Sequence, residues 1–368
     1  MPLTLYVDRE AWRHHQLGQL EAEPDLVPVA KGNGYGFTVP VLARAAAGLG
    51  VDQLAVGTVE EAAAVLGVFP GDLIVLESCL DAPDPPADDD RIVRTAASVD
   101  AVRKLAGHRM IIDCRSSLRR QGLAPAELAL AAQALGGGTG GQGESEGTRE
   151  SGSLGGATVP GAWRVEGFSL HFPLRRPPDS DPAAETAGWV EAVAAAGFAP
   201  RTFYVSHLGR AEIDGLRHAF PAVRFRPRVG TRLWLGAPEA VEARATVLDT
   251  FPVQRGDRLG YRQDRAWRDG WLVVVSGGTV QGVGLEAPRR LRGIAARGRE
   301  LLRWGLAAAN RTRSPFTWQG RKQWFAEPPH ILVSMLYLPR QCEPPEPGQE
   351  IPAELRHTMT HFDQVVIR

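Results

Sequence analysis

The sequence predicts an α/β protein in which a (β/α)8 TIM barrel is followed by a mainly antiparallel β domain. Apolar strand-like runs alternate with helical stretches over the first 230 residues or so, which is typical of a barrel. From about residue 238 the pattern turns β-rich, with frequent turns and little helix. The length of 368 residues leaves room for one large domain and one smaller domain.

The barrel is predicted from eight apolar runs, each flanked by a helical pattern. The runs follow an opening strand at 3–7 and a short helix, and they cover 26–31, 54–58, 72–78, 91–96, 109–114, 165–172, 202–207 and 223–229. The clearest helical patterns cover 39–49, 59–66, 98–106, 124–135, 184–196 and 210–219. Strands that are apolar on both faces and lead into helices indicate parallel βα units. Eight such units fit a closed barrel better than an open sheet.

The change of pattern sets the expected domain boundaries. We expect the barrel at 8–235, and a β domain made of 1–7 plus 238–368, with the opening strand paired into that domain and one helix at roughly 288–309. Residues 136–156 are dominated by glycine and contain almost no apolar side chains. This stretch predicts a flexible insertion on the amino-terminal side of the barrel, away from an active site.

Composition excludes several classes of protein. Acidic and basic residues balance at 42 each, so we expect no general attraction to nucleic acid or to an anionic membrane. We recognise no signal peptide and no membrane span, which makes the cytoplasm the expected location. Cys79, Cys114 and Cys342 are scattered without a CxxC pair, so neither a disulfide framework nor a cysteine zinc site is expected, and no metal is predicted.

Lysine is rare in this chain, because only Lys31, Lys104 and Lys322 of the 42 basic residues are lysines. Arginine cannot form an imine, since its guanidinium is never usefully deprotonated, whereas a lysine amine can. Each lysine is therefore a candidate for amine chemistry, and a solvated surface position is the alternative for each.

Polar residues gather where the predicted barrel strands end, at the rim that carries the chemistry of such barrels. They are Lys31 after the first strand, Asp113 and Arg119/Arg120 after the fifth, His171 at the sixth, Ser206 and His207 at the seventh, and Arg228 at the eighth, followed by Gly230 and Thr231. An amine, a basic cluster and a phosphate-ready turn on one rim are what a phosphorylated aldehyde cofactor requires.

More ordinary explanations stay open for single members of this set. His171 could be a hydrogen-bonded histidine at a strand end. Any of Arg224, Arg226 and Arg228 could form a salt bridge that seals the barrel.

The segment VPVAKGNGYGF, followed by LGVDQLAVGTVEEA, resembles the barrel of bacterial alanine racemases and related fold-type III pyridoxal-phosphate enzymes. The resemblance implies that Lys31 binds pyridoxal 5'-phosphate through an imine and that Tyr35 contacts its phosphate. SLRRQGL resembles the family's G-M-x-R-x-G-F, which implies that Arg120 lies near the substrate carboxylate.

Later barrel motifs extend the resemblance. EGFSLHF implies that His171 is the family's orienting histidine, and VSH places Ser206 or His207 at its phosphate-binding serine. RVGTRLWLG resembles R-P-G-I-x-L-Y-G and implies two further roles. Arg228 would be the partner of the pyridine nitrogen, and Gly230 and Thr231 would supply backbone donors to the phosphate.

In the β domain the resemblance is partial. GDRLGYRQ implies that Tyr261 is the second catalytic base, which in the family reaches across a dimer interface. PHILVSMLYLP resembles the V-S-M-D segment and implies a substrate contact at Met335, with Leu336 where the family has aspartate. The family's G-Y-A-D-G is replaced by SGGTVQGVG, a departure near the expected substrate mouth.

Taken together, the resemblance implies an amino-acid racemase with two-base proton transfer at Cα. Its catalytic residues would be Lys31, Tyr261, His171 and Arg228, and the protein would be a homodimer with composite sites acting on a small-molecule amino acid. The alternatives are another fold-type III pyridoxal-phosphate enzyme, such as a decarboxylase or a D-amino-acid lyase, and a non-catalytic protein that binds the cofactor. The sequence does not name the amino acid.

Overall fold

The computed structural model describes residues 2–78, 89–136 and 164–286 and, from 293 to 368, all residues except 296, 299, 302–304 and 306–310. The chain forms two compact units. The barrel unit comprises Leu17–Gly32 and Val39–Leu233, and the β unit comprises Met1–Gln16, Asn33–Thr38 and Trp234–Arg368. Nearly all of the glycine-rich stretch 136–156 and most of the helix expected at 288–309 lie outside the described residues.

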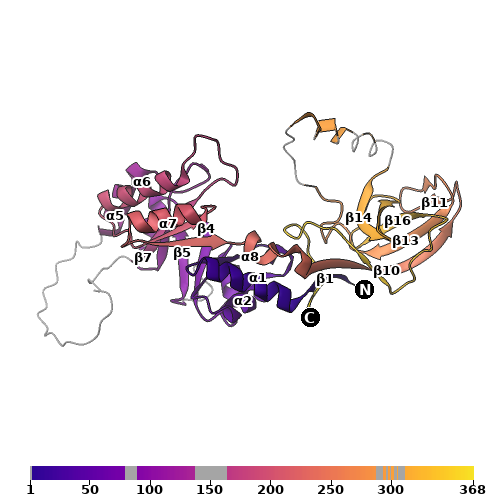
Figure 1. The fold of residues 1–368 in the computed structure, drawn as a ribbon, viewed down its shortest axis with the longest axis horizontal. Helices are drawn as coiled ribbons and strands as arrows, with labels where there is room; N and C mark the ends of the chain where they lie inside the picture. The colour runs from indigo at the N-terminus through magenta and orange to yellow at the C-terminus, as the bar shows by residue number, and fades with distance from the viewer. Residues whose placement is uncertain are drawn as a thin grey trace, which may run out of the picture. The chain divides into compact units, whose positions relative to one another are not determined.

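The barrel unit confirms the predicted closed parallel barrel (Figure 1). Within the described part of the chain, eight strands pair in sequence order and the last closes on the first. They are β2 (Val27–Ala30), β3 (Gln53–Val56), β4 (Asp72–Ser78), β5 (Ile92–Ala96), β6 (Met110–Asp113), β7 (Val165–His171), β8 (Thr202–Ser206) and β9 (Arg224–Val229).

Helices accompany these strands. They are α1 (Arg9–Ala22), α2 (Val39–Gly48), α3 (Val59–Val65), α4 (Val99–Lys104), α5 (Leu128–Gly136), α6 (Pro182–Ala195), α7 (Arg210–Ala219) and α8 (Thr231–Leu235), with short 3-10 turns η1 (Gly34–Gly36), η2 (Pro125–Glu127) and η3 (Pro238–Ala240). Helices α3, α4 and α6 each begin at a residue whose side chain caps the helix. Thr58 accepts a hydrogen bond of 3.2 Å from the amide of Glu61 in α3, and Asp181 accepts one of 2.9 Å from Ala184 in α6. Such caps satisfy amide donors that would otherwise lack partners at a helix start.

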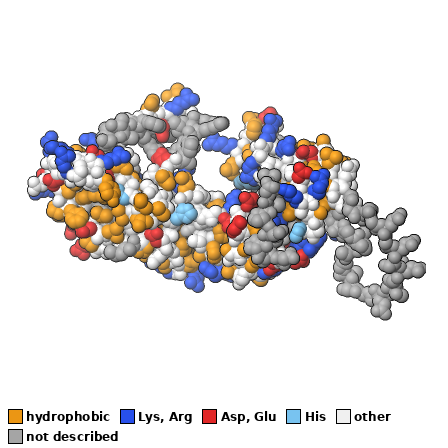
Figure 2. Space-filling model, turned by 180° about the vertical axis from the view of Figure 1, so that it is seen from behind, with side chains coloured by type: hydrophobic (Ala, Val, Ile, Leu, Met, Phe, Trp, Pro, Cys, Tyr) orange, Lys and Arg blue, Asp and Glu red, His pale blue; other side chains and the backbone are white. Residues whose placement is uncertain are grey.

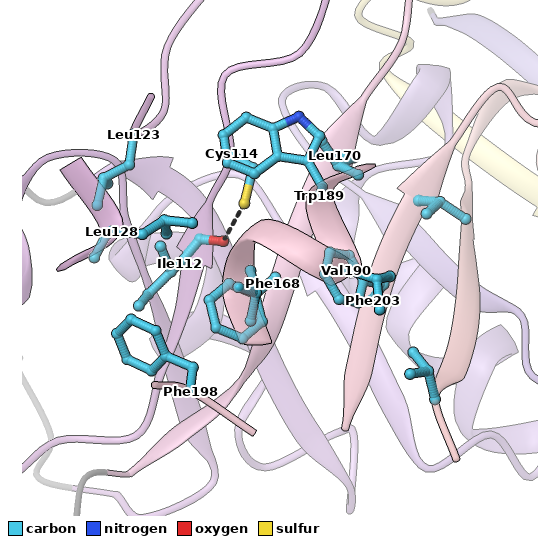
Figure 3. Close-up of a cluster of buried hydrophobic side chains, with 14 of the residues drawn as sticks. Ile112, Cys114, Leu123, Leu128, Phe168, Leu170, Trp189, Val190, Phe198 and Phe203 are labelled. Carbon is cyan, nitrogen blue, oxygen red and sulfur yellow. Dashed lines mark hydrogen bonds between the residues drawn. The ribbon is translucent and has the colours of Figure 1, made fainter. Parts of the chain in front are cut away.

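The main hydrophobic core lies between the strands and the surrounding helices (Figure 3). Phe168 of β7 stacks on Phe203 of β8 with ring centroids 5.5 Å apart, and Trp189 of α6 belongs to the same buried cluster. A second, smaller cluster fills the inside of the barrel. The alternation of side chains along each strand separates the two clusters, because odd and even positions face opposite sides.

The amino-terminal end of the barrel is closed by ion pairs and buried hydrogen bonds. Buried Arg226 donates to Asp52 at 3.0 Å and to Gln53 at 2.7 Å through Nη1, and its Nη2 also contacts Asp52. The hydroxyl of Tyr204 donates to the same Gln53 side chain at 3.0 Å. This network links β3, β8 and β9 at the end opposite the predicted site.

The β unit contains the mainly antiparallel sheet that the sequence predicts. Among the described residues this sheet has eight strands: seven lie in the order β14-β15-β16-β13-β10-β1-β18, and β17 pairs with β10. The strands are β1 (Leu3–Val7), β10 (Val241–Val253), β13 (Gly270–Ser276), β14 (Arg313–Trp318), β15 (Arg321–Phe325), β16 (Val333–Pro339), β17 (Glu350–Pro352) and β18 (Gln364–Ile367), and a separate hairpin joins β11 (Arg258–Leu259) to β12 (Asp264–Arg265). The opening strand β1 pairs with β10 and β18, as predicted.

The described surface carries both signs of charge (Figure 2), as expected from the equal numbers of acidic and basic residues. In the part of the chain that the structure describes, no helix is long and apolar enough to cross a membrane.

Candidate active site

Lys31 and Asp113 lie at the carboxyl ends of β2 and β6 and face the barrel interior. The interior core contains Val29 of β2 and Ile111 of β6. Side chains two residues apart on a strand point the same way, so Lys31 and Asp113 continue these interior rows. Lys31 follows the last residue of β2 and lies at the open end of the barrel, where part of the residue is exposed while its amine is partly desolvated.

Three further predicted residues face the same end from β7, β8 and β9. Ser206 lies two residues after Tyr204, which belongs to the interior core, and it pairs with His171 across β7 and β8. Arg226 pairs with Tyr204, and Arg228 lies two residues further along the same strand. The structure therefore brings Lys31, His171, Ser206 and Arg228 to one rim.

The surroundings of Lys31 favour its neutral amine. Burial lowers the pKa of Lys31, the guanidinium groups of Arg120 and Arg228 lower it further, and Glu61 opposes them. A lower pKa leaves a larger fraction of unprotonated amine at neutral pH. Lys31 thus has the property that imine chemistry requires.

Arg228 is deeply placed and poorly satisfied by the protein. Its Nη2 donates to the carbonyl of Leu170 at 3.3 Å, and its Nε is buried without a hydrogen-bond partner. Burial lowers the pKa of Arg228, with Arg120 acting in the same direction and Asp113 in the opposite direction. An unpartnered buried donor in such a site fits an acceptor atom supplied by a ligand.

The two rim histidines form a contact of their own. The rings of His171 and His207 meet edge to face with centroids 5.0 Å apart. Burial lowers the pKa of His171 to about 3, and the positive charge of Arg228 contributes next. His171 is therefore neutral at physiological pH, so it can orient a partner by hydrogen bonding but carries no charge.

Ser206 and His207, the two candidate phosphate contacts at the end of β8, differ in burial and in backbone conformation. Ser206 is buried and faces the interior, whereas His207 is exposed and has a left-handed backbone with φ of 66°. Arg176 supports this turn, because it bonds the carbonyl of His207 and pairs with Glu212 at 2.6 Å. The geometry points Ser206, rather than His207, into the barrel.

The remaining predicted phosphate and carboxylate contacts occupy loops. Gly230 and Thr231 follow β9 directly, and Thr231 begins the short helix α8. Arg120 is exposed in the loop after β6 and acts electrostatically on Lys31, His171 and Arg228. Arg120 thus belongs to the same basic cluster as Lys31.

Tyr35, Tyr261 and Met335 belong to the β unit. Tyr35 is buried in the left-handed turn η1, and burial raises its pKa to about 12. Met335 is half-buried in β16, where it pairs with Val274. Tyr261 is exposed, with 85% of its surface accessible. The roles implied for these three residues stay predictions.

A buried carboxylate holds the turn that carries Tyr261. Glu327 accepts hydrogen bonds from the amides of Tyr261 at 3.3 Å and Arg262 at 3.4 Å, and it contacts His330 Nε2 at 2.5 Å. The His330 ring lies 4.5 Å from the Tyr261 ring, centroid to centroid. Gly260, with φ of 61°, makes room for the carboxylate, because a Cβ there would lie 1.8 Å from Glu327.

Sequence reasoning did not identify the supporting residues of either unit. Glu327 and His330 lie far from Tyr261 in the chain. Asp113 accepts from Ser169 at 2.5 Å and from Gln121 at 3.1 Å inside the barrel. The strand-end position of Asp113 was visible in the sequence, but its partners were not.

Among the described residues no group of three or more His, Cys, Asp and Glu side chains is placed to hold a metal ion. The chemistry-bearing groups at the barrel rim are an amine, guanidinium groups, a neutral histidine and a buried hydroxyl. Such a set suits an anionic organic ligand with an aldehyde or an acceptor ring atom.

A comparison with protein families finds one match, over the first part of the chain. Residues 7–143 match the model of the alanine racemase N-terminal domain. A search of curated proteins finds no match.

Solved structures of alanine racemases share the fold. The alanine racemase of Clostridium difficile 630 has a TM-score of 0.67 at 14% identity, covering 96% of this chain and 87% of that one. The enzyme from Bartonella henselae, solved with covalently bound pyridoxal phosphate, has a TM-score of 0.65 at 15% identity, covering 97% and 91%. The enzyme from Bacillus anthracis, solved with bound L-Ala-P, has a TM-score of 0.65 at 16% identity, covering 100% and 87%. At these identities the likeness shows the fold.

The fold and the rim define a two-unit protein in which a (β/α)8 barrel presents a lysine beside a cluster of arginines. Residues 7–143 are similar to the N-terminal domain of alanine racemases, and the fold of the chain is that of the solved alanine racemases.

Proposed function

We propose that this protein is a pyridoxal-phosphate-dependent amino-acid racemase. The observation that carries the proposal is the pairing of Lys31, whose pKa is lowered by burial and by Arg120 and Arg228, with the unpartnered buried Nε of Arg228 at the same barrel rim. One group is suited to bind an aldehyde carbon, and the other is suited to donate to a ring acceptor.

The residues present fit pyridoxal 5'-phosphate. Lys31 would hold the aldehyde carbon, and Arg228 would donate to the pyridine nitrogen. Ser206 and the amides of Gly230 and Thr231 would hold the phosphate, and the sequence resemblance adds Tyr35 as a further phosphate contact. When bound, the cofactor supplies an electrophilic carbon and an electron-withdrawing ring that acidifies the Cα–H bond of an attached amino acid.

The protein's own residues would then move the proton. Lys31 Nζ would take or return the Cα proton on one face, and the Tyr261 hydroxyl would do so on the other, because stereoinversion needs acid–base groups on both faces. Arg120 would bind the substrate carboxylate, and neutral His171 would orient its neighbours at the rim.

A homodimer with composite sites completes the proposal. Tyr261 is 85% exposed, and Val280, Ile331 and Leu332 near it on the β unit are also exposed, at 58%, 67% and 59%. Backbone hydrogen bonds join Val280 to Ile331 at 3.1 Å and Thr279 to His330 at 2.8 Å, so these apolar side chains share a region with the Tyr261 turn. Exposed apolar groups around a predicted acid–base residue suit a subunit interface. A cytoplasmic location remains part of the proposal on the sequence grounds given above.

A second candidate is another reaction of fold-type III pyridoxal-phosphate enzymes, such as decarboxylation or D-amino-acid cleavage. Leu336 occupies the position of the family's aspartate, and its side chain is fully buried in the β-unit core. A buried leucine cannot contact a substrate, so this part of the substrate mouth differs from that of the family.

Two measurements test the proposal. Borohydride reduction of the yellow holoprotein, followed by peptide mapping, should place the cofactor on Lys31, and a label on Lys104 or Lys322 would refute the lysine assignment. Incubation with each L-amino acid in deuterated water, followed by chiral analysis, should yield the D-enantiomer with deuterium at Cα. Release of carbon dioxide or of a cleaved carbonyl product instead would identify the second candidate.

A further inference from the structure

Glu61 ties together the ends of the first two barrel strands. Its Oε1 accepts a hydrogen bond of 2.7 Å from the amide of Gly32, directly after Lys31. Its Oε2 accepts one of 2.7 Å from the amide of Gly57, directly after β3. Glu61 lies in the first turn of α3, which Thr58 caps, so the carboxylate starts from a fixed backbone.

The two glycines make this bridge sterically feasible. A Cβ on Gly57 would lie 2.8 Å from Glu61 Oε2 and 3.2 Å from the Cβ of Lys31. A larger residue at position 57 would therefore displace the Glu61 carboxylate and crowd Lys31. Gly32 has φ of 62°, a left-handed conformation that turns its amide toward the carboxylate. Lys31 is therefore packed against a strand end that Glu61 holds in place.

Glu61 also differs in charge from the other groups that act on Lys31. Arg120, in the loop after β6, and Arg228, in β9, are positively charged. Both lower the pKa of Lys31, because they disfavour its protonated, positively charged form. His171 and His207 also interact electrostatically with Lys31, from β7 and from the turn after β8. Glu61 acts in the opposite direction to the arginines and raises the pKa of Lys31.

We propose that Glu61 is the positioning residue of Lys31. It fixes the turn that carries the lysine and supplies a nearby negative charge that favours the protonated amine. The lysine can then alternate between a proton-holding and a proton-free form during proton transfer. The proposal deepens the proposed function and rests on it, since it assigns Glu61 to the lysine expected to bind the cofactor.

Direct titration of Lys31 tests this role, because the chain has only three lysines. Reductive methylation of the cofactor-free full chain with 13C-formaldehyde labels Lys31, Lys104 and Lys322, and NMR follows each amine against pH. In Glu61→Gln, loss of the negative charge should move the Lys31 midpoint to lower pH by about one pH unit. Lys322, which pairs with Glu354 at 2.5 Å, should titrate unchanged as an internal reference.

Glu60→Gln is the matched control. Glu60 is the neighbour of Glu61 in the sequence and its side chain is exposed, so this variant loses the same charge at an adjacent position. The Lys31 midpoint should stay in place in this variant. An unchanged Lys31 midpoint in Glu61→Gln, or an equal displacement in both variants, would overturn the proposal. Glu61→Asp keeps the charge on a shorter side chain, and its midpoint should fall between those of Glu61→Gln and the unsubstituted chain.

Hydrogen exchange in the unsubstituted chain tests the bridge without any variant. The Gly32 and Gly57 amides should exchange slowly, although Gly32 is exposed. Exchange at the rate of open peptide would contradict the bridge. The borohydride map separates the two proposals: a label absent from Lys31 refutes the cofactor assignment, whereas a label on Lys31 with an unmoved titration midpoint in Glu61→Gln refutes only the role of Glu61.

Discussion

Two arginines on β9, two residues apart, face the same barrel interior but have opposite surroundings. Arg226 lies toward the amino-terminal end and binds Asp52 and Gln53 at 3.0 and 2.7 Å. Arg228 lies toward the carboxyl end, donates one bond of 3.3 Å to a carbonyl, and has a buried Nε without a partner. The first arginine is satisfied by the protein, whereas the second leaves a donor for something else.

This difference indicates that the amino-terminal end of the barrel stabilises the fold, whereas the carboxyl end carries the groups suited to bind a ligand. Removing one partner of a well-paired buried charge strongly destabilises a protein. A buried charge with few partners contributes little stability, so its removal changes the free energy of unfolding little. Residues at the carboxyl ends of barrel strands commonly serve chemistry, and those at the other end serve stability. We therefore expect substitution of Arg226 to lower the unfolding free energy more than substitution of Arg228 does. Substitution of Arg228 should lower activity more than substitution of Arg226 does.

The largest effect on stability is expected for Arg226→Met. The substitution removes the hydrogen bonds to Asp52 and Gln53 while keeping most of the side-chain volume. The free energy of unfolding should fall by about 2–4 kcal/mol, measured by urea denaturation. Cofactor binding should persist in the fraction that stays folded. A loss below 0.5 kcal/mol would show that the buried network is not what closes this end.

Acidification should produce the next largest effect, through His171. Its folded pKa is about 3, while the unfolded value is about 6.5. Between these values the unfolded chain binds a proton that the folded chain does not, so stability falls as pH drops below 6.5. Between pH 7.5 and 5 the unsubstituted chain should lose about 1 kcal/mol more stability than His171→Gln, allowing for partial exposure of the ring.

An exposed histidine provides the control for the acid effect. His108→Gln should show the same pH dependence as the unsubstituted chain, because His108 lies on the surface. Parallel stability curves for the His171→Gln variant and the unsubstituted chain would mean that His171 is accessible enough to be protonated in the folded state.

Arg228→Met should change stability by less than about 1 kcal/mol, because the arginine repays little of the cost of its burial. The proposed activity should nevertheless fall by about 100-fold or more, as for removal of a positioned electrostatic group. Arg228→Met should thus have a small effect on stability and a large effect on activity, whereas Arg226→Met should have a large effect on stability. Equal losses of stability in the two variants would remove the distinction between the barrel ends.

The sequence predicted the architecture of both units because their strands carry strong local patterns. The run DLIVLES at 72–78 coincides with β4, and the other barrel strands agree within two residues at each end. A buried parallel strand must be apolar on both faces, which makes it visible without tertiary information. Lys31 and Arg228 were predicted at the rim because strand ends define it, and the structure places both residues at the ends of their strands.

The sequence could not reveal residues whose role depends on distant partners. Glu327 lies 66 positions from Tyr261, the amide of which it binds. Asn33 donates to the carbonyls of His357 and Thr360 at 2.7 and 2.8 Å, which draws a six-residue turn of the barrel sequence into the β unit. The sequence resemblance already pointed to Arg228 rather than Arg226, but the different partners of these two arginines are visible only in the structure.

The smallest effect on stability is expected for Tyr261→Phe. The ring is 85% exposed and no hydrogen bond of its hydroxyl is found among the described residues, so the free energy of unfolding should change by less than about 0.5 kcal/mol. The proposed racemisation should be lost, because one face of Cα would lack an acid–base group. Borohydride labelling of Lys31 should be retained, which separates the role of the tyrosine from that of the lysine.

Subunit mixing extends this prediction to the proposed dimer. If Tyr261 completes the site of the partner subunit, inactive Tyr261→Phe and inactive Lys31→Ala chains should together form mixed dimers with one intact site. Such dimers should regain up to about half of the activity of an unsubstituted dimer. The alternative is that Tyr261 has a structural role beside His330, with ring centroids 4.5 Å apart. Full activity of Tyr261→Phe, or no recovery in dimers shown to exchange subunits, would support that alternative.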